Sequence, residues 1–277
     1  MKILIVTTRS DRSFGRIVEE GEKRGISVDV FFYEKLRIHE IDNFAAGYDF
    51  CILRDPYNTG RDFSVYLRHI MSLFKPSIVL DYGTYAEHPF YEDKLYQHML
   101  FSRHIRMPKL YHYNIPEMVN IRDFPVVVKR RISSRGKGVY VIQSTDELKR
   151  FVLEHEIHEF IFTDYIEIKA DIRVFVLGGK VICSVERRRR FKNRDGYRGV
   201  GVKVTHAYNI PSRIRLDALK AAELIKTDFC GVDFLIDIEG RHYMLECNIS
   251  PQFIASERAT GINIASMLID FITSKIK

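Results

Sequence analysis

The stretch that decides the fold runs from residue 230 to residue 248 and reads CGVDFLIDIEGRHYMLECN. Two apolar runs flank the Glu239-Gly240 pair, which predicts a β-hairpin with a two-residue turn. With that turn, Asp233 lies directly opposite Glu246. Asn248 shares the face of Glu246, because side chains alternate along a strand. The hairpin therefore predicts three oxygen-bearing side chains on one patch of a sheet.

This acid pair needs a positively charged partner. Two carboxylates that face each other repel, and their aliphatic neighbours predict a buried setting that strengthens the repulsion. A hard divalent cation such as Mg²⁺ fits, since it takes carboxylate and amide oxygens and keeps waters for a phosphate ligand. The alternative is a slipped register in which one carboxylate points to solvent.

Strands and helices alternate over residues 3–80, which predicts a parallel sheet flanked by helices. We expect strands at 3–7, 28–33, 50–54 and 77–80, and helices at 13–25 and 63–74. A further helix is expected at 91–103, and later segments indicate an α+β half with antiparallel hairpins. Its expected strands are 125–129, 139–142, 160–166, 172–177, 180–186, 231–237 and 242–248, and its helices are 145–152, 214–224 and 264–276.

Composition sets the broad class. The chain has 277 residues, of which 46% are hydrophobic and 29% charged, and this excludes a collagen, a disordered tail and a disulfide-stapled mini-protein. A net charge of +7 favours an anionic partner, either a nucleotide, an acidic substrate or a nucleic acid. The four cysteines lie in apolar stretches without a C-x-x-C pair, which predicts buried free thiols in a reducing cytoplasm.

Two basic elements follow residues 125–129. Lys129 ends an apolar strand, where an unpaired charge is rare, so a phosphate partner is expected; the alternative is a solvent-exposed strand end. Residues 132–139 form a Gly/Ser/basic loop whose N–H groups can close over phosphate oxygens. It is not a P-loop, because Gly138 replaces the Ser or Thr and the loop joins two strands. A plain flexible hairpin loop is the alternative.

Together these segments resemble the RimK-like branch of the ATP-grasp ligases, over nearly the whole chain. The motifs are Asp93-Lys94-Leu95, Pro125–Lys129, Ser133–Val139, Thr163–Glu167, Asp171–Val176, Gly231–Leu235, Leu245–Pro251 and Glu257–Ala265. The resemblance implies a mixed α/β and α+β ATP-grasp fold, in which an N-terminal βαβ lobe precedes two α+β lobes that clasp ATP. The implied domains are 1–88 before the grasp, 89–160 with the glycine loop, and 161–277 with the metal-binding hairpin.

The resemblance also implies roles for individual residues. The implied nucleotide-binding residues are Lys94, Lys129, Ser133, Ser134, Arg135, Gly136, Gly138, Asp164, Tyr165, Ile166 and Asp171. The implied metal ligands are Asp233 for one Mg²⁺, Glu246 bridging two ions and Asn248 for the second, with Mn²⁺ as an alternative. Lys129 and Arg198 are the implied catalytic residues. Arg198 comes from the family's F-R-x-N signature, which here reads Tyr197-Arg198-Gly199-Val200.

The implied reaction is ATP-dependent ligation of a carboxylate to an amine through an acyl phosphate, with release of ADP. Such a site must place two anions together and neutralise the charge that builds up. The expected partners are ATP, an acidic carboxylate acceptor on a protein or small molecule, and an amino acid such as glutamate. Neither membrane nor nucleic acid is expected, and relatives commonly form homo-oligomers. The alternative function is a non-catalytic module that binds nucleotide or RNA on the same scaffold.

One further segment, residues 187–198, is densely basic and is expected to form a loop. Three interpretations remain open for it: a solvated loop, a subsite for an acidic substrate, or an RNA-binding strip. The RNA interpretation is the weakest, because no aromatic stacking motif accompanies the charges.

Overall fold

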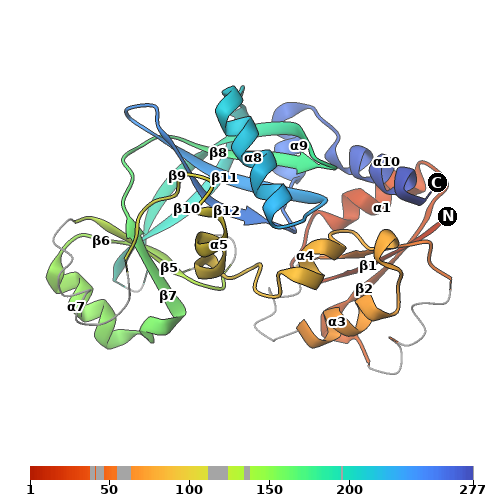
Figure 1. The fold of residues 1–277 in the computed structure, drawn as a ribbon, viewed down its shortest axis with the longest axis horizontal. Helices are drawn as coiled ribbons and strands as arrows, with labels where there is room; N and C mark the ends of the chain where they lie inside the picture. Colours follow the sequence, from red (N-terminus) through yellow and green to blue (C-terminus); the bar gives the residue numbers. More distant parts are fainter. Residues whose placement is uncertain are drawn as a thin grey trace.

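The computed structural model describes residues 1–37, 41, 47–54, 64–111, 124–133, 138–194 and 196–276, of which 64, 65 and 194 are described by their backbone alone. These residues form two sheets (Figure 1). A three-stranded parallel sheet has the order β2-β1-β3, and a nine-stranded antiparallel sheet has the order β12-β11-β8-β9-β10-β6-β5-β7-β4. The mixture of α/β and α+β structure that the sequence predicts is confirmed.

The N-terminal lobe contains the parallel sheet. Its elements are β1 (Lys2–Thr7), α1 (Phe14–Glu22), β2 (Ser27–Phe32), η1 (Tyr33–Lys35), β3 (Phe50–Leu53), α3 (Ser64–Ser72), η3 (Pro76–Ile78) and α4 (Tyr82–Glu87). The central strand β1 is fully buried from Ile3 to Val6, as expected for a parallel strand covered on both faces. The strand expected at 77–80 is wrong: Pro76 begins a 3-10 helix, and only Val79 bridges to Cys51.

The central lobe follows. Its elements are α5 (Lys94–Phe101), β4 (Leu110–Tyr111), β5 (Val126–Arg130), β6 (Val139–Ile142), α7 (Thr145–Glu154), η4 (Ile157–Glu159) and β7 (Phe160–Asp164). Val126, Val128 and Phe162 pack with Phe151 of α7 in a small core on one face of the sheet. Because side chains alternate, Val127, Lys129 and Thr163 lie on the opposite face.

The C-terminal lobe supplies the rest of the large sheet. Its elements are β8 (Ile168–Leu177), β9 (Lys180–Arg194), β10 (Tyr197–Ala207), α8 (Ser212–Leu224), β11 (Phe229–Asp237), β12 (His242–Asn248), α9 (Ile254–Thr260) and α10 (Ile264–Ile276). Helix α8 packs on one face of β8 and β11, and α10 packs on the other together with residues of β1. The four cysteines are buried free thiols, so the predicted burial and the predicted lack of disulfides are confirmed. Among the described residues, no helix combines the length and apolarity needed to cross a bilayer.

The loop expected at residues 187–198 is wrong. Strand β9 continues to Arg194, and β10 begins at Tyr197, so the basic run forms a two-stranded ribbon. Valines at 200, 202 and 204 on β10 pair with Phe191, Arg189 and Arg187. These β-branched partners favour a strand despite the charges, because β propensity depends largely on cross-strand packing.

The hairpin of β11 and β12 pairs Asp233 with Glu246, as predicted, but not through a two-residue turn. The loop has three residues, 238–240: the N–H of Asp237 donates to the carbonyl of Arg241 at 2.9 Å. Gly240 has a φ of 83°, which favours glycine. Compared with a two-residue turn, this longer turn shifts the pairing of the two strands by one residue. A bulge between the Asp233 and Phe234 pairs, with Leu245 as the extra residue, restores the predicted pairing.

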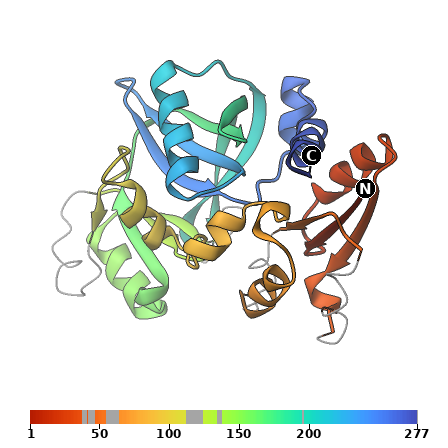
Figure 2. The same cartoon turned by 45° about the vertical axis from the view of Figure 1, so that its right-hand side comes forward.

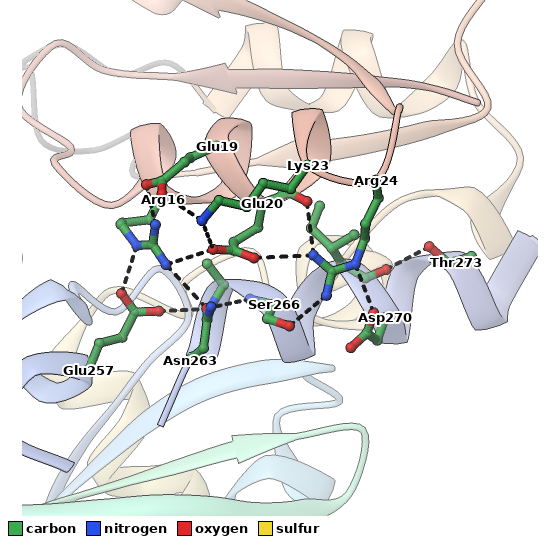
Figure 3. Close-up of polar contacts among 12 residues, drawn as sticks. Arg16, Glu19, Glu20, Lys23, Arg24, Glu257, Asn263, Ser266, Asp270 and Thr273 are labelled. Atoms are coloured by element: carbon green, nitrogen blue, oxygen red, sulfur yellow. Dashed lines mark hydrogen bonds and ion pairs between the residues drawn. The ribbon is translucent and has the colours of Figure 1, made fainter. Parts of the chain in front are cut away.

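The N-terminal lobe is attached to the C-terminal helices by a network of charges. In Figure 2 the C-terminal helix lies beside the red N-terminal lobe, and Figure 3 shows the side chains that join them. Glu20 of α1 is 4% exposed and lies within 3.2 Å of Arg16, Lys23 and Arg24. Arg16 also binds Glu257 of α9 at 3.0 Å. This network fixes α1 against the segment that follows the predicted metal ligands.

Candidate active site

One face of the nine-stranded sheet collects most of the predicted site residues. Residues paired across neighbouring strands point to the same side, so the register can be followed from strand to strand. The successive pairs on this face are Glu246 with Asp233, Asp233 with Arg173, Asp171 with Arg187, Arg189 with Val202, Arg198 with Val141, and Val127 with Thr163. The face therefore continues from the β11–β12 hairpin to the central lobe that carries Lys129.

Asp233 is held by two arginines. Its side chain is 4% exposed, and Arg173 binds both oxygens, with Nε 2.7 Å from Oδ1 and Nη2 2.8 Å from Oδ2. Nη1 of Arg187 lies 2.7 Å from Oδ2. Burial raises the pKa of Asp233, but the charges of Arg173 and Arg187 outweigh burial and bring that pKa below its usual value. Asp233 is therefore an anion near neutral pH.

The charge network extends along β8 and β9. Nε of Arg187 donates to Oδ1 of Asp171 at 2.8 Å, and Nε of Arg189 donates to Oδ2 at 2.7 Å. Arg187 is 6% exposed, so both of its carboxylate partners are needed to compensate a buried charge. The sequence analysis treats Arg187 and Arg189 only as members of the basic run at 187–198, and it does not single out Arg173. Strand alternation would have placed Arg187 and Arg189 on one face, had the run been interpreted as a strand.

Glu246 is more open than Asp233. Its side chain is 28% exposed, and its Oε2 lies 3.7 Å from Nζ of Lys94. The amide of Asn248 donates to Oε1 of Glu246 at 3.4 Å and to the carbonyl of Gly231 at 3.3 Å. The hairpin thus brings the three predicted metal ligands to neighbouring positions, and lysine and arginine side chains now surround the two acids.

Helix α5 places Lys94 against this face. Asp93 caps the helix by accepting the N–H of Leu95 at 2.8 Å, so Lys94 is the first helical residue. Nζ of Lys94 donates to the carbonyl of Ser133 at 3.0 Å. Lys94 therefore joins the acid pair to the start of the glycine loop.

Gln97 is a positioning residue that the sequence did not reveal. Its amide binds the backbone of Cys247 twice: Nε2 donates to the carbonyl at 2.9 Å, and Oε1 accepts the N–H at 2.8 Å. Cys247 lies between Glu246 and Asn248, so this pair of hydrogen bonds fixes α5 to the strand that carries the acid. The contact joins segments about 150 residues apart, and no local pattern signals it.

Lys129 faces the same region from the central lobe. The pKa of Lys129 is lowered to about 8, mainly by burial. Arg189 and Lys94 also lower this pKa, and Glu246 and Asp171 act in the opposite direction. Lys129 thus interacts electrostatically with charged groups of the central lobe and of the C-terminal lobe. A bound phosphate would stabilise its charged form.

This pKa predicts a pH dependence of nucleotide binding. As pH rises through about 8, Lys129 loses its proton, so we expect the affinity for ADP to fall, by up to about tenfold per pH unit. Titration with a fluorescent ADP analogue over this range measures the change. The variant Lys129→Arg keeps its charge and should show a flatter profile. Identical profiles for both proteins would contradict the assignment.

Thr163 marks a gap in the hydrogen bonding of this face. The residue is 2% exposed, and its Oγ1 has no hydrogen-bond partner among the described residues. A buried hydroxyl without a partner costs about 1–3 kcal/mol, which a polar ligand would relieve. Asp164 follows, with its carboxylate bound by the hydroxyl of Tyr111 at 2.6 Å. Tyr165 and Ile166 are half-buried between β7 and β8.

The remaining predicted residues lie farther from the acid pair. Arg198 is exposed, and its guanidinium stacks 3.8 Å from the ring centroid of Phe191. Within the described residues, no hydrogen bond or ion pair joins Arg198 to the acids or to Lys129. Gly138 has a φ of 68°, and its carbonyl accepts the N–H of Arg130 at 2.7 Å, so it closes the glycine loop. The predicted loop residues Ser134, Arg135 and Gly136 lie outside the described residues.

The arrangement of these lobes is that of the ATP-grasp fold. Two solved structures have the same fold over nearly the whole chain, at identities that show the fold alone. The ATP-grasp ligase PsnB complexed with minimal precursor has a TM-score of 0.77 and 16% identity, with 99% of each chain covered. D-alanine--D-alanine ligase from Bacillus anthracis has a TM-score of 0.70 and 19% identity, with 100% of this chain and 97% of that chain covered.

The sequence comparison is more specific. Residues 98–272 match the RimK-like ATP-grasp domain, and the chain belongs to that family. A probable alpha-L-glutamate ligase of Psychromonas ingrahamii is 29% identical, over 100% of this chain and 96% of its own. Beta-citrylglutamate synthase B of Mus musculus is 28% identical over 59% of this chain, which spans only 43% of that relative. The RimK-like resemblance, the ATP-grasp fold and the class of ATP-dependent carboxylate–amine ligase are confirmed.

Proposed function

We propose that this chain uses ATP to activate a carboxylate as an acyl phosphate and then joins it to the amine of an amino acid, releasing ADP and phosphate. The observation that carries the proposal is the pairing of Asp233 with Glu246 on a face shared with cationic side chains from both lobes. A nucleotide triphosphate supplies the anion that these cations would bind. The orphan hydroxyl of Thr163 supports a polar ligand on the same face.

The donor set fits Mg²⁺, which the ATP-grasp class uses, and a structure of PsnB contains Mg and ADP. Two carboxylates and an amide oxygen are hard ligands at adjacent positions of one hairpin. We propose Asp233, Glu246 and Asn248 as the ligands, for two ions, with Mn²⁺ as a substitute. When bound, the metal would neutralise phosphate charge. Released from Glu246, Lys94 would then be free to bind a phosphate oxygen.

The protein side chains supply positioning and electrostatics. We propose that Lys94 and Lys129 hold the phosphates, and that Ser133 and Gly138 position the glycine loop, whose Ser134, Arg135 and Gly136 would bind phosphate. The backbone at 164–166 would hold the adenine, and Asp171 would face the ribose or the edge of the nucleotide. Arg198, on the same face, is the proposed catalytic cation that holds the acceptor carboxylate. One well-placed electrostatic contact of this kind lowers the activation barrier by about 3 kcal/mol.

For the amino acid, we propose glutamate. Two relatives that align over nearly their full lengths, from Psychromonas ingrahamii and Methanococcoides burtonii, carry the name probable alpha-L-glutamate ligase. The acceptor would be a carboxylate on a protein or a small molecule. The net charge of +7 and the arginines of the site favour an acidic acceptor.

The test is a screen for phosphate release with ATP, Mg²⁺, glutamate and candidate carboxylates. We expect release only when acceptor and amine are both present, with ADP rather than AMP as the nucleotide product and with loss of activity on chelation. Mass spectrometry of the acceptor should show an added glutamate residue. Nucleotide binding without turnover on any carboxylate would instead support the non-catalytic module.

A further inference from the structure

Strand geometry divides the basic run of β9 into two sets. Arg187 and Arg189 point toward the acids of the site. Arg188, Arg190 and Lys192 alternate with them, so they point to the opposite face of the ribbon, and all three are exposed. Lys203 of β10 pairs with Arg188 and is also exposed on this outer face. We call these four residues the outer basic patch.

The outer basic patch has no internal compensation. Within the part of the chain that the structure describes, no ion pair involves any of its four side chains. Arg188 and Lys203 stand directly opposite each other, and like charges in that position destabilise a sheet. Glu186, the nearest acid along β9, pairs with His206 at 3.3 Å. An anionic partner would remove the repulsion within the patch.

The same part of β9 is also an edge strand. Its pairing with β8 ends at the Asp171–Arg187 pair, whereas its pairing with β10 continues to Arg194. Among the described residues, no strand pairs with residues 188–193 on the β8 side. Backbone N–H and C=O groups along such an edge can accept an additional strand. Charged outer side chains and an open edge thus occur in one segment.

We infer that residues 188–193 of β9 bind an extended acidic polypeptide as an added antiparallel strand, with its outward carboxylates beside Arg188, Arg190 and Lys192. The inference rests on the proposed function in one respect, because this polypeptide would be the carboxylate acceptor. An added strand antiparallel to β9 runs in the same direction as β8, so its C-terminal end lies where β8 and β9 separate, next to Asp171 and Arg187. Its C-terminal carboxyl group would therefore lie at the entrance to the site.

RNA fits this surface less well. Single-stranded RNA binds through aromatic side chains on which bases stack. Phe191, the exposed aromatic residue of the ribbon, lies on the site face and is covered by Arg198. The outer face offers positive charges and the adjoining edge of β9 offers backbone N–H and C=O groups, and an acidic strand would bind both.

The test measures binding of an N-terminally labelled octaglutamate peptide by fluorescence anisotropy, without ATP. The triple variant Arg188→Glu, Arg190→Glu, Lys192→Glu should bind roughly 100-fold more weakly. A control with the same change of charge is Arg103→Glu, Lys149→Glu, Arg215→Glu, at exposed positions elsewhere. The control should bind as the unmodified protein does. If both variants lost affinity for the peptide equally, the loss would be explained by net charge alone, and the inference would be overturned.

A second measurement tests the strand geometry. Two peptides are compared, one N-methylated at the odd residues and the other at the even residues. Their affinities should differ, because only one of the two patterns removes the N–H groups that bond to β9. Equal binding of both would overturn the strand addition. Binding of a uridine decamer that depends on the patch, without binding of the peptide, would also overturn the inference. Because no ATP is present, a failure of ligase activity would leave this result unaffected, and the two proposals can fail separately.

Discussion

Replacing Glu246 with glutamine should lower ATP-dependent phosphate release by about 100- to 1,000-fold, with little change in melting temperature. The side chain is 28% exposed, and its ion pair with Lys94 is long at 3.7 Å, so the fold gains little from its charge. Glutamine keeps the shape of the side chain but removes the negative charge that a divalent cation needs. A coupled phosphate-release assay and thermal unfolding measure the two effects.

A matched control is Glu239→Gln, in the turn of the same hairpin. Glu239 is 61% exposed and binds Arg241 at the surface, so this variant should retain both its activity and its stability. Full activity of Glu246→Gln would remove the central support for the proposed metal site. A large drop in melting temperature would show instead that Glu246 is needed for folding.

Replacing Asp233 with leucine should have a different result, a loss of about 3–5 kcal/mol in the free energy of unfolding. Asp233 is the common partner of Arg173 and Arg187, and its removal leaves two largely buried guanidinium groups without one of their counter-charges. Urea denaturation measures the loss. Activity alone would not separate the two roles of Asp233, because the variant removes a proposed metal ligand as well.

A double-mutant cycle separates them. The variant Arg173→Met on its own leaves Asp233 with Arg187, and combined with Asp233→Leu it removes a buried charge of each sign. We expect the double variant to recover part of the stability lost in Asp233→Leu, and to remain inactive. A loss below about 1 kcal/mol in Asp233→Leu would mean that the arginines are compensated elsewhere.

The sequence predicted most of the sheet and the acid pair, because two-residue periodicity can be read locally. The Asp233–Glu246 pairing was correct although the turn was not, since the bulge at Leu245 offset the longer turn. The strands at 3–7 and 125–129 were found for another reason, because they are nearly continuous apolar runs, which is typical of strands covered on both faces. A bulge has no reliable local signature, so its contribution could not have been foreseen.

What the sequence missed depends on contacts between distant segments. The charges at 187–194 concealed a strand, because the apolar partners that favour it belong to β10. Arg173 reaches Asp233 from a neighbouring strand, and Gln97 reaches Cys247 from a helix of the other lobe. The residues of each such contact are far apart in the sequence, so no periodic pattern predicts that they meet. The family resemblance supplied roles for single residues, but not the ion pairs that surround them.

The attachment of the N-terminal lobe has a consequence for how substrates enter. Arg54, 1% exposed, donates to Asp11 at 2.8 Å and to the carbonyl of Pro251 at 3.1 Å, just beyond Asn248. Together with the contacts of Glu20, it makes this lobe and the C-terminal helices one rigid unit. Among the described residues, the sheet of the central lobe is joined to β10 by two strand pairs, those of Arg198 and Gly199. Opening and closing is therefore expected as a swing of strands β5–β7 and α7 about that short ladder, while the remainder stays still.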